Sequence, residues 1–184
     1  MSLFTGKGDN GTTKTFGCDQ RISKSSTIAE ALGSLDEVNS FLGLVKVECV
    51  ETKIKYKELS VDKIVHSIQE NLFIIQAEVA GADKSISEQK VKEAEEIING
   101  IEKELPPIHT FFIAGGTKLA SLFDVARTTA RRAERRVVGV SEEGLRTVSP
   151  NTLAFLNRLS SLLYALARFS NHIVGVKEEA PDYK

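Results

Sequence analysis

The stretch SPNTLAFLNRLSSLLYALARFSNHIV, residues 149–174, decides the fold class. Ser149-Pro150 is typical of a helix start, with a capping serine followed by proline at the first helical position, and Gly175 marks the end. Between these limits apolar residues occupy nearly every side of the predicted helix: Phe155, Leu156, Leu159, Leu162, Leu163 and Leu166. A helix that is apolar nearly all round lies at the centre of a bundle.

Four further amphipathic segments precede this central helix. Apolar residues recur at helical spacing over residues 26–46, 61–82, 86–105 and 118–138. The third of these segments opens with Ser85-Ile86-Ser87-Glu88, which matches a capping box, and Pro106-Pro107 halts it. Consecutive helices with short loops and no convincing strands predict an all-α protein, a five-helix bundle with ferritin-like packing.

The histidines exclude the metal chemistry of many such bundles. His66, His109 and His172 are scattered, and none has a glutamate three residues before it. The Glu-x-x-His ligands of a di-iron carboxylate bundle are therefore missing, and we predict no metal site built from protein ligands alone.

Size and composition limit the possible functions. The chain has 184 residues, a formal net charge of -1 and 41% hydrophobic residues, which predicts one domain rather than a coat for nucleic acid or an anionic membrane. No apolar run approaches the roughly 18 residues of a membrane span, and the start lacks a secretion signal, so we expect a soluble, cytoplasmic protein.

Cys18 and Cys49 are expected to be reduced thiols. Within the domain, residues 1–24 form a polar segment, 25–175 the bundle and 176–184 a tail.

The N-terminal segment is rich in glycine, threonine and lysine, and residues 5–15 read TGKGDNGTTKT. Glycine lets backbone N–H groups face an anion, hydroxyls donate to phosphate oxygens and lysine supplies charge. Asp9 could serve a cation or cap a turn. No strand precedes the glycines and no apolar helix follows them, which excludes a dinucleotide-binding fingerprint. On composition alone, a flexible tail and a phosphate-binding loop both remain open.

Arginines crowd residues 127–136, which read RTTARRAERR. At 100° per residue, Arg127, Arg131 and Glu134 fall beside the buried stripe, whereas Arg132 and Arg136 point to the far side. An arginine beside an apolar stripe pairs with a carboxylate or holds an anionic ligand, and Glu134 can neutralise one. An internal ion-pair network and a ligand site are thus two interpretations. A nucleic-acid-binding stripe is the third, and the near-neutral net charge of the chain weakens it.

Polar residues also interrupt two apolar helices. In the central helix they share one side, within about 100° of each other: Asn157, Ser160, Ser161, Tyr164, Arg168 and Asn171. In the first helix Asn39 sits in the apolar stripe and Asp36 at its edge. Such groups either satisfy one another inside the bundle or line a site.

Four motifs, taken together and in order, resemble the PduO-type ATP:cob(I)alamin adenosyltransferases over nearly the whole chain. They are TGKGDNGTT at 5–13, GSLDEVNS at 33–40, RTTARRAERR at 127–136 and NRLS at 157–160. The resemblance implies a homotrimer of five-helix bundles that binds ATP where two subunits meet. It identifies the glycine-rich segment as the nucleotide-binding loop.

The resemblance also implies roles for single residues. The nucleotide-binding loop comprises Thr5, Gly6, Gly8, Asp9, Gly11, Thr12 and Thr13, with Lys24 adding charge. Arg131 and Glu134 match nucleotide-contacting residues, and Asn157 matches an asparagine of the same site. Asp36 and Arg127 match a pair that bridges subunits and supports the corrinoid site, to which we add Asn39 and Arg135 as binding residues. Phe111 matches an aromatic at the lower face of cobalt. Two departures are Ala114 and Ser161, where the family usually has proline and aspartate.

The implied reaction is transfer of the 5′-deoxyadenosyl group of ATP to cob(I)alamin, which yields adenosylcobalamin and triphosphate. The cobalt is already the nucleophile, which agrees with a sequence that offers no activated serine, cysteine or general base. Mg²⁺ is the expected cofactor, and a flavin-dependent reductase and a cobalamin-dependent acceptor enzyme are the expected partners. The alternative hypothesis is a non-catalytic helical binding protein whose arginine helix docks an acidic partner.

Overall fold

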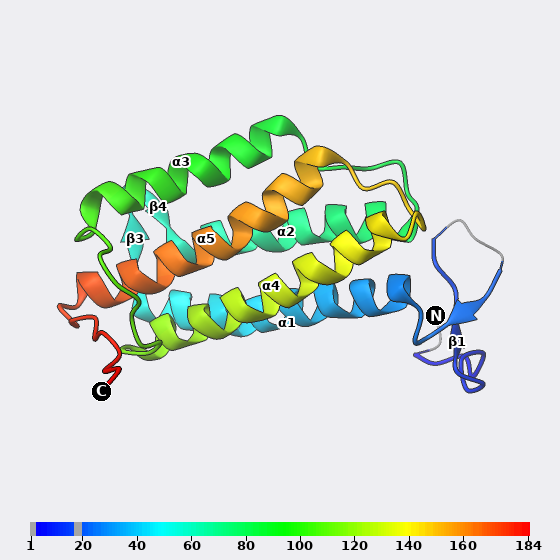
Figure 1. Cartoon of the computed structure of the whole chain (residues 1–184), viewed down its shortest axis with the longest axis horizontal. Coiled ribbons are helices and arrows are strands. Elements are labelled where there is room, and N and C mark those ends of the chain that lie inside the picture. The colour runs from blue at the N-terminus through cyan, green and yellow to red at the C-terminus, as the bar shows by residue number, and fades with distance from the viewer. Residues whose placement is uncertain (1–2, 17–19) are drawn as a thin grey trace.

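The computed structural model describes residues 3–16 and 20–184. In these residues it has five helices: α1 (Thr27–Thr52), α2 (Val61–Ala80), α3 (Glu88–Glu104), α4 (Lys118–Glu142) and α5 (Pro150–Ile173). Successive helices run antiparallel along the length of the molecule (Figure 1). The helix α5 packs against α3 and α4, and α1 packs against α2 and α4. The prediction of an all-α five-helix bundle is confirmed.

The helix starts follow local capping chemistry. Ser149 Oγ accepts a hydrogen bond from the Thr152 amide at 3.1 Å, and Thr117 Oγ1 accepts one from the Ala120 amide at 3.1 Å. The predicted starts of α4 and α5 are therefore confirmed. The capping serine of α3 is Ser87, however, and the prediction of a start at Ser85 is wrong. The amide of Ile86 donates instead to Thr152 Oγ1 on α5, which holds this residue outside the helix.

Two helix ends differ from the sequence prediction. The first helix continues beyond Lys46 to Thr52, and the fourth continues beyond Val138 to Glu142. Cys49 and Val140 are both buried in these added turns, so packing against the rest of the bundle extends each helix.

Burial also raises the pKa of the Cys49 thiol to about 12, which keeps it protonated. Cys18 lies outside the described residues.

Two very short hairpins accompany the helices. Strands β1 (Thr12–Thr13) and β2 (Ile22–Ser23) pair within the N-terminal segment, and β3 (Lys55–Tyr56) pairs with β4 (Leu59–Ser60) between α1 and α2. Each strand has two residues, so the fold class is unchanged. No helix in the described part of the chain is long and apolar enough to span a membrane.

Candidate functional site

A groove lies between α4, α5 and the loop that leads into α4. Arg127 and Arg131 line it from successive turns of α4, and Ser160, Ser161 and Tyr164 line it from α5. Residues 108–112 of the loop complete the lining, and the volume is about 580 Å³. Phe111 contributes an exposed ring, with 79% of the residue accessible. The loop side of the groove is thus mainly apolar, and the helix side carries cationic and hydroxyl groups.

A second, polar hollow continues from this groove along α4. Its lining is Arg131, Glu134, Arg135, Val138, Glu142 and Asn157, and its volume is about 380 Å³. Arg131 lines both spaces. The candidate site therefore joins an apolar groove to a polar hollow at one arginine.

Arg131 keeps most of its hydrogen-bonding capacity for a ligand. Its Nη1 donates to Ser160 Oγ at 3.4 Å, while Glu134 accepts from Asn157 Nδ2 at 3.2 Å. The expectation that Glu134 neutralises a neighbouring arginine is wrong for the described chain, because its carboxylate faces the Asn157 amide across the hollow. A guanidinium has five N–H donors, so several remain available to an anion.

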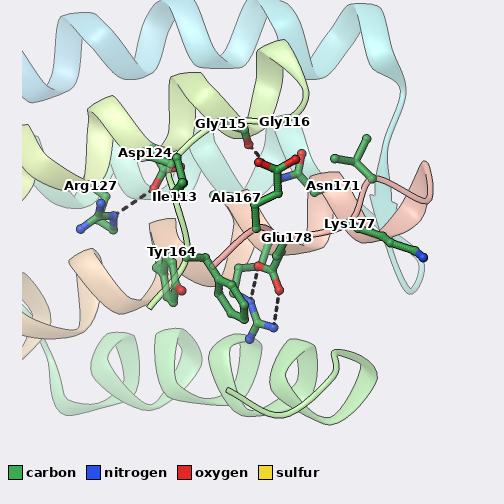
Figure 2. A pocket seen from close by; sticks show the side chains of 15 residues that line it. Ile113, Gly115, Gly116, Asp124, Arg127, Tyr164, Ala167, Asn171, Lys177 and Glu178 are labelled. Carbon is green, nitrogen blue, oxygen red and sulfur yellow. Dashed lines mark hydrogen bonds and ion pairs between the residues drawn. The ribbon is translucent and has the colours of Figure 1, made fainter. Parts of the chain in front are cut away.

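Arg127 is held by a partner that sequence reasoning missed. Its Nε donates to Asp124 Oδ1 at 3.2 Å, one turn earlier on α4, as Figure 2 shows. The guanidinium also lies 5.7 Å from the centre of the Tyr164 ring. The three-residue spacing of Asp124 and Arg127 is the signal that could have revealed this pair.

Arg132 and Arg136 face away from the groove, as their helical positions predict. Arg132 Nη2 binds Glu37 Oε2 of α1 at 2.5 Å, and Arg136 lies 4.0 Å from Glu30. Arg135 Nη1 donates to the Arg131 carbonyl at 3.2 Å and lies along its own helix. Together with Arg127, three arginines of α4 are thus paired with carboxylates of the chain, which weakens the hypothesis of an arginine helix that docks an acidic partner.

The N-terminal segment folds into a loop of successive turns. Gly6 and Gly11 have positive φ angles of 66° and 78°, a conformation that favours glycine. The Asp9 amide donates to the Gly6 carbonyl, the Gly11 amide to the Gly8 carbonyl, and the Lys24 amide to the Gly11 carbonyl. A Cβ atom at Gly8 would lie 3.2 Å from Lys24 Nζ, so the lysine covers this glycine closely. Lys24 therefore lies at the loop, although at least twelve residues separate it in sequence from Gly6, Gly8 and Gly11.

A residue of this loop that sequence reasoning missed is Arg21. Its Nε donates to Thr12 Oγ1 at 2.6 Å and its Nη2 to the Thr12 carbonyl at 2.7 Å. It is the single arginine of residues 1–24, which is the signal that could have found it.

Part of the predicted site does not assemble within one chain. Of the described residues that line the groove and the polar hollow, none comes from the nucleotide-binding loop. The loop lies beyond the end of the bundle where α1 begins (Figure 1). At this end Thr27 Oγ1 of α1 donates to Glu143 Oε2, just after α4, at 2.8 Å.

Asp36 is exposed and, among the residues described, has no hydrogen-bond or ion-pair partner. The predicted Asp36–Arg127 pair is absent within the chain. Asn39 is buried, with its Oδ1 unpartnered.

Comparison with known proteins shows the family of this chain. The family model described as cobalamin adenosyltransferase matches residues 3–170. The chain belongs to this family. Among cobalamin adenosyltransferases, the corrinoid adenosyltransferase of Bacillus subtilis is 37% identical over 182 residues, which cover 96% of this chain and 90% of the relative. Corrinoid adenosyltransferase PduO of Citrobacter freundii is 36% identical over 179 residues, which cover 94% of this chain and 50% of the relative. This chain therefore spans about half the length of that relative.

Solved structures of the family have the same fold. One is a phenylalanine-to-histidine variant of the PduO-type ATP:corrinoid adenosyltransferase from Lactobacillus reuteri, complexed with cobalamin and ATP. It matches with a TM-score of 0.87 and 29% identity, over 99% of this chain and 97% of that chain. An arginine-to-lysine variant of the L. reuteri enzyme, complexed with ATP, matches with a TM-score of 0.85 and 30% identity over 98% and 100% of the two chains.

Proposed function

We propose that this cobalamin adenosyltransferase transfers the 5′-deoxyadenosyl group of ATP to cob(I)alamin and releases triphosphate. The observation that carries the proposal is the junction at Arg131 of an apolar groove and a polar hollow, in a chain of this family. An apolar groove suits the face of a corrin ring, and a polar hollow suits a nucleotide. The related L. reuteri structure holds both cobalamin and ATP, which supports the same pair of substrates here.

The reaction needs little chemistry from the side chains. The cobalt lone pair attacks C5′ of ATP, a Co–C bond forms, and the C5′–O bond breaks with its electrons passing to triphosphate. No protein nucleophile or base takes part. The protein therefore contributes alignment of the two substrates and neutralisation of the leaving group.

Arg131 is the residue best placed to bind the leaving triphosphate. It is exposed to both spaces and holds one long hydrogen bond, to Ser160. We assign Glu134, Asn157 and Arg135, the other polar side chains of the hollow, to orienting the nucleoside. The N–H groups of the nucleotide-binding loop and the Lys24 ammonium would add positive potential along the phosphates.

Mg²⁺ fits this loop as an ion held mainly by the nucleotide. The described residues contain no group of three candidate metal ligands, but Asp9 and the hydroxyls of Thr5 and Thr12 lie in one short exposed loop. Magnesium is commonly bound by one or two carboxylates together with phosphate oxygens and water. Asp9 would hold such an ion, which would neutralise part of the charge on the triphosphate.

Phe111 is assigned to the lower face of cobalt. Phe111 is exposed and lines the same groove as Arg127 and Arg131, and a buried core role does not agree with this exposure. An apolar ring in place of the axial ligand would make cob(II)alamin easier to reduce, which prepares the cobalt nucleophile.

A homotrimer would complete the site. An exposed apolar stripe on α1 and α4 is available for subunit contacts: Leu44, Val47, Val50 and Val125. Asp36 has a free carboxylate on the same helix α1, which suits the predicted bridge to Arg127 of a second subunit. Association would also bring a nucleotide-binding loop to the polar hollow of a neighbour. We propose that each chain is one domain, with the bundle over 25–175.

Calorimetric titration and product analysis test the proposal. We expect ATP to bind with a sub-millimolar dissociation constant, and one triphosphate to be released for each cobalamin consumed. A non-catalytic binding protein would do neither. Failure to bind ATP in the presence of Mg²⁺ would count against the proposed function.

A further inference from the structure

The loop that carries Phe111, residues 105–117, is attached to α5 and to the C-terminal tail at three points. At its start, Arg168 Nη2 donates to the Pro106 carbonyl at 2.9 Å. In its middle, the Ile113 amide donates to the Glu179 carbonyl of the tail at 2.8 Å. At its end, Asn171 Nδ2 donates to the Gly115 carbonyl at 2.8 Å. We call this segment the Phe111 loop.

Arg168 joins the tail to this loop. The residue is 5% exposed, and its Nε and Nη2 bind the two oxygens of Glu178 at 2.6 and 2.7 Å. Its guanidinium also lies 5.3 Å from the centre of the Phe112 ring, next to Phe111. One buried side chain of α5 therefore binds the tail and two parts of the loop.

Asn171 fixes the end of the same loop. Its Nδ2 donates to the Gly115 carbonyl (Figure 2). Its Oδ1 accepts from the Thr117 amide at 2.8 Å. Gly116 has a φ of 96°, and a Cβ atom there would lie 2.5 Å from Asn171 Oδ1. Only glycine fits so close to the asparagine, so the turn is built around Asn171.

Phe111 itself has little packing to hold it. With 79% of the residue exposed, its position depends on the attachments of its neighbours Phe112 and Ile113. A ring that must meet one face of a substrate gains from such external support, because small displacements of a positioned group reduce rate.

We propose that Arg168, in its ion pair with Glu178, is a positioning residue for Phe111. The pair fastens the tail over the Phe111 loop and fixes the ring in the groove. The contribution to reduction of cob(II)alamin rests on the proposed function, whereas the effect on the position of residue 111 does not. The competing interpretation is that the pair only attaches the tail.

A tryptophan reporter tests the positioning directly. The chain has no tryptophan, so Phe111→Trp gives a single emitter on the loop. Glu178→Ala in this background leaves the buried guanidinium unpaired, and we expect the fluorescence anisotropy of Trp to fall. Glu179→Ala is the matched control, because it removes a neighbouring exposed carboxylate of the same tail and keeps the ion pair. Equal anisotropy in the two variants would overturn the proposal.

Activity of the same two substitutions in the native chain gives the second readout. We expect Glu178→Ala to lower adenosylation of cob(II)alamin with a weak reductant by about 10-fold, and adenosylation of prepared cob(I)alamin by less than about 2-fold. The KM for ATP should stay close to that of Glu179→Ala, whereas the melting temperature should fall, because the buried Arg168 guanidinium loses its carboxylate. Equal losses with both cobalt states would reduce the pair to a structural role.

The unsubstituted protein separates the two proposals. If it forms no adenosylcobalamin from cob(I)alamin and ATP, the proposed function fails, and the anisotropy alone decides the positioning. If it is active and the two alanine variants are equal in both assays, the positioning role fails and the proposed function stands.

Discussion

At the scale of single residues, the neighbours Arg131 and Arg132 give the sharpest contrast. Arg131 faces the groove and the polar hollow, and Arg132 pairs with Glu37 on the other side of α4. We predict that Arg131→Ala lowers turnover by about 10²-fold or more, the scale expected when a preorganised charge at a leaving group is lost. Arg132→Ala should change turnover little, because Arg132 lines neither space. It should also change stability little, because an exposed ion pair such as Arg132–Glu37 contributes about 0–1 kcal/mol.

The measurement is the initial rate with ATP and prepared cob(I)alamin for both variants. Melting temperatures serve as the control for folding. Similar rate losses in the two variants would refute the assignment of Arg131 to the leaving group.

A substitution at Phe111 tests its proposed role in the reduction of cobalt separately from alkylation. We predict that Phe111→Ala keeps ATP affinity and impairs adenosylation when cob(II)alamin and a weak reductant are supplied. The defect should shrink with prepared cob(I)alamin, because reduction is then bypassed. Since the ring is exposed, the melting temperature should change little. A loss of about 3–5 kcal/mol in the free energy of unfolding would instead place Phe111 in a core.

Sequence reasoning found which residues of α4 share a face but not what each one binds. Helical spacing separates Arg131 from Arg132 because the angle per residue is fixed. The partner of Arg168, in contrast, is Glu178, beyond the end of α5. No periodicity relates a helix to the tail that follows it, so such contacts appear only with the fold.

At the scale of elements, the nucleotide-binding loop should respond to its ligand. Its described residues are largely exposed, and Thr15 is the one buried residue between 3 and 16. We predict that the exposed amides of the loop exchange rapidly without nucleotide and become protected with Mg·ATP. Hydrogen exchange followed by mass spectrometry measures this. The amides of α5 provide the internal control, and equal protection of the loop in both conditions would contradict the prediction.

Helix starts were more predictable from the sequence than helix ends. Ser149 and Thr117 cap α5 and α4 through bonds to residues three positions away, and such local chemistry is visible in the sequence. The ends of α1 and α4 depend on the burial of Cys49 and Val140 by other helices. Ser85 failed as a cap for the same kind of reason, since Ile86 is bound to Thr152 of α5.

At the scale of the whole molecule, the predicted site is divided between the loop and the bundle. We predict a trimer at micromolar concentration, because association would cover Leu44 and Val47 and give Asp36 a partner. Sedimentation velocity measures the mass, and a monomer would contradict the prediction. Asp36→Ala is a useful comparison, as it should weaken the trimer or its corrinoid affinity while the fold of each chain is kept.

The sequence motifs predict which residues form the site, but a single chain does not bring all of these residues together. The Arg131, Glu134 and Asn157 side chains meet in one hollow, as the two helical faces require. The loop and Asp36 do not join them within the chain. We predict that contacts between subunits bring them in, and such contacts would leave no signal in the periodicity of one chain.

The central claim is the transfer itself, and one measurement tests it most directly. Purified protein is mixed with Mg·ATP and chemically reduced cob(I)alamin in the absence of oxygen, and the cobalamin spectrum and the free triphosphate are followed together. The account predicts adenosylcobalamin and triphosphate in equal amounts, at a rate proportional to protein concentration and reduced by Arg131→Ala. ATP binding without formation of either product would contradict it.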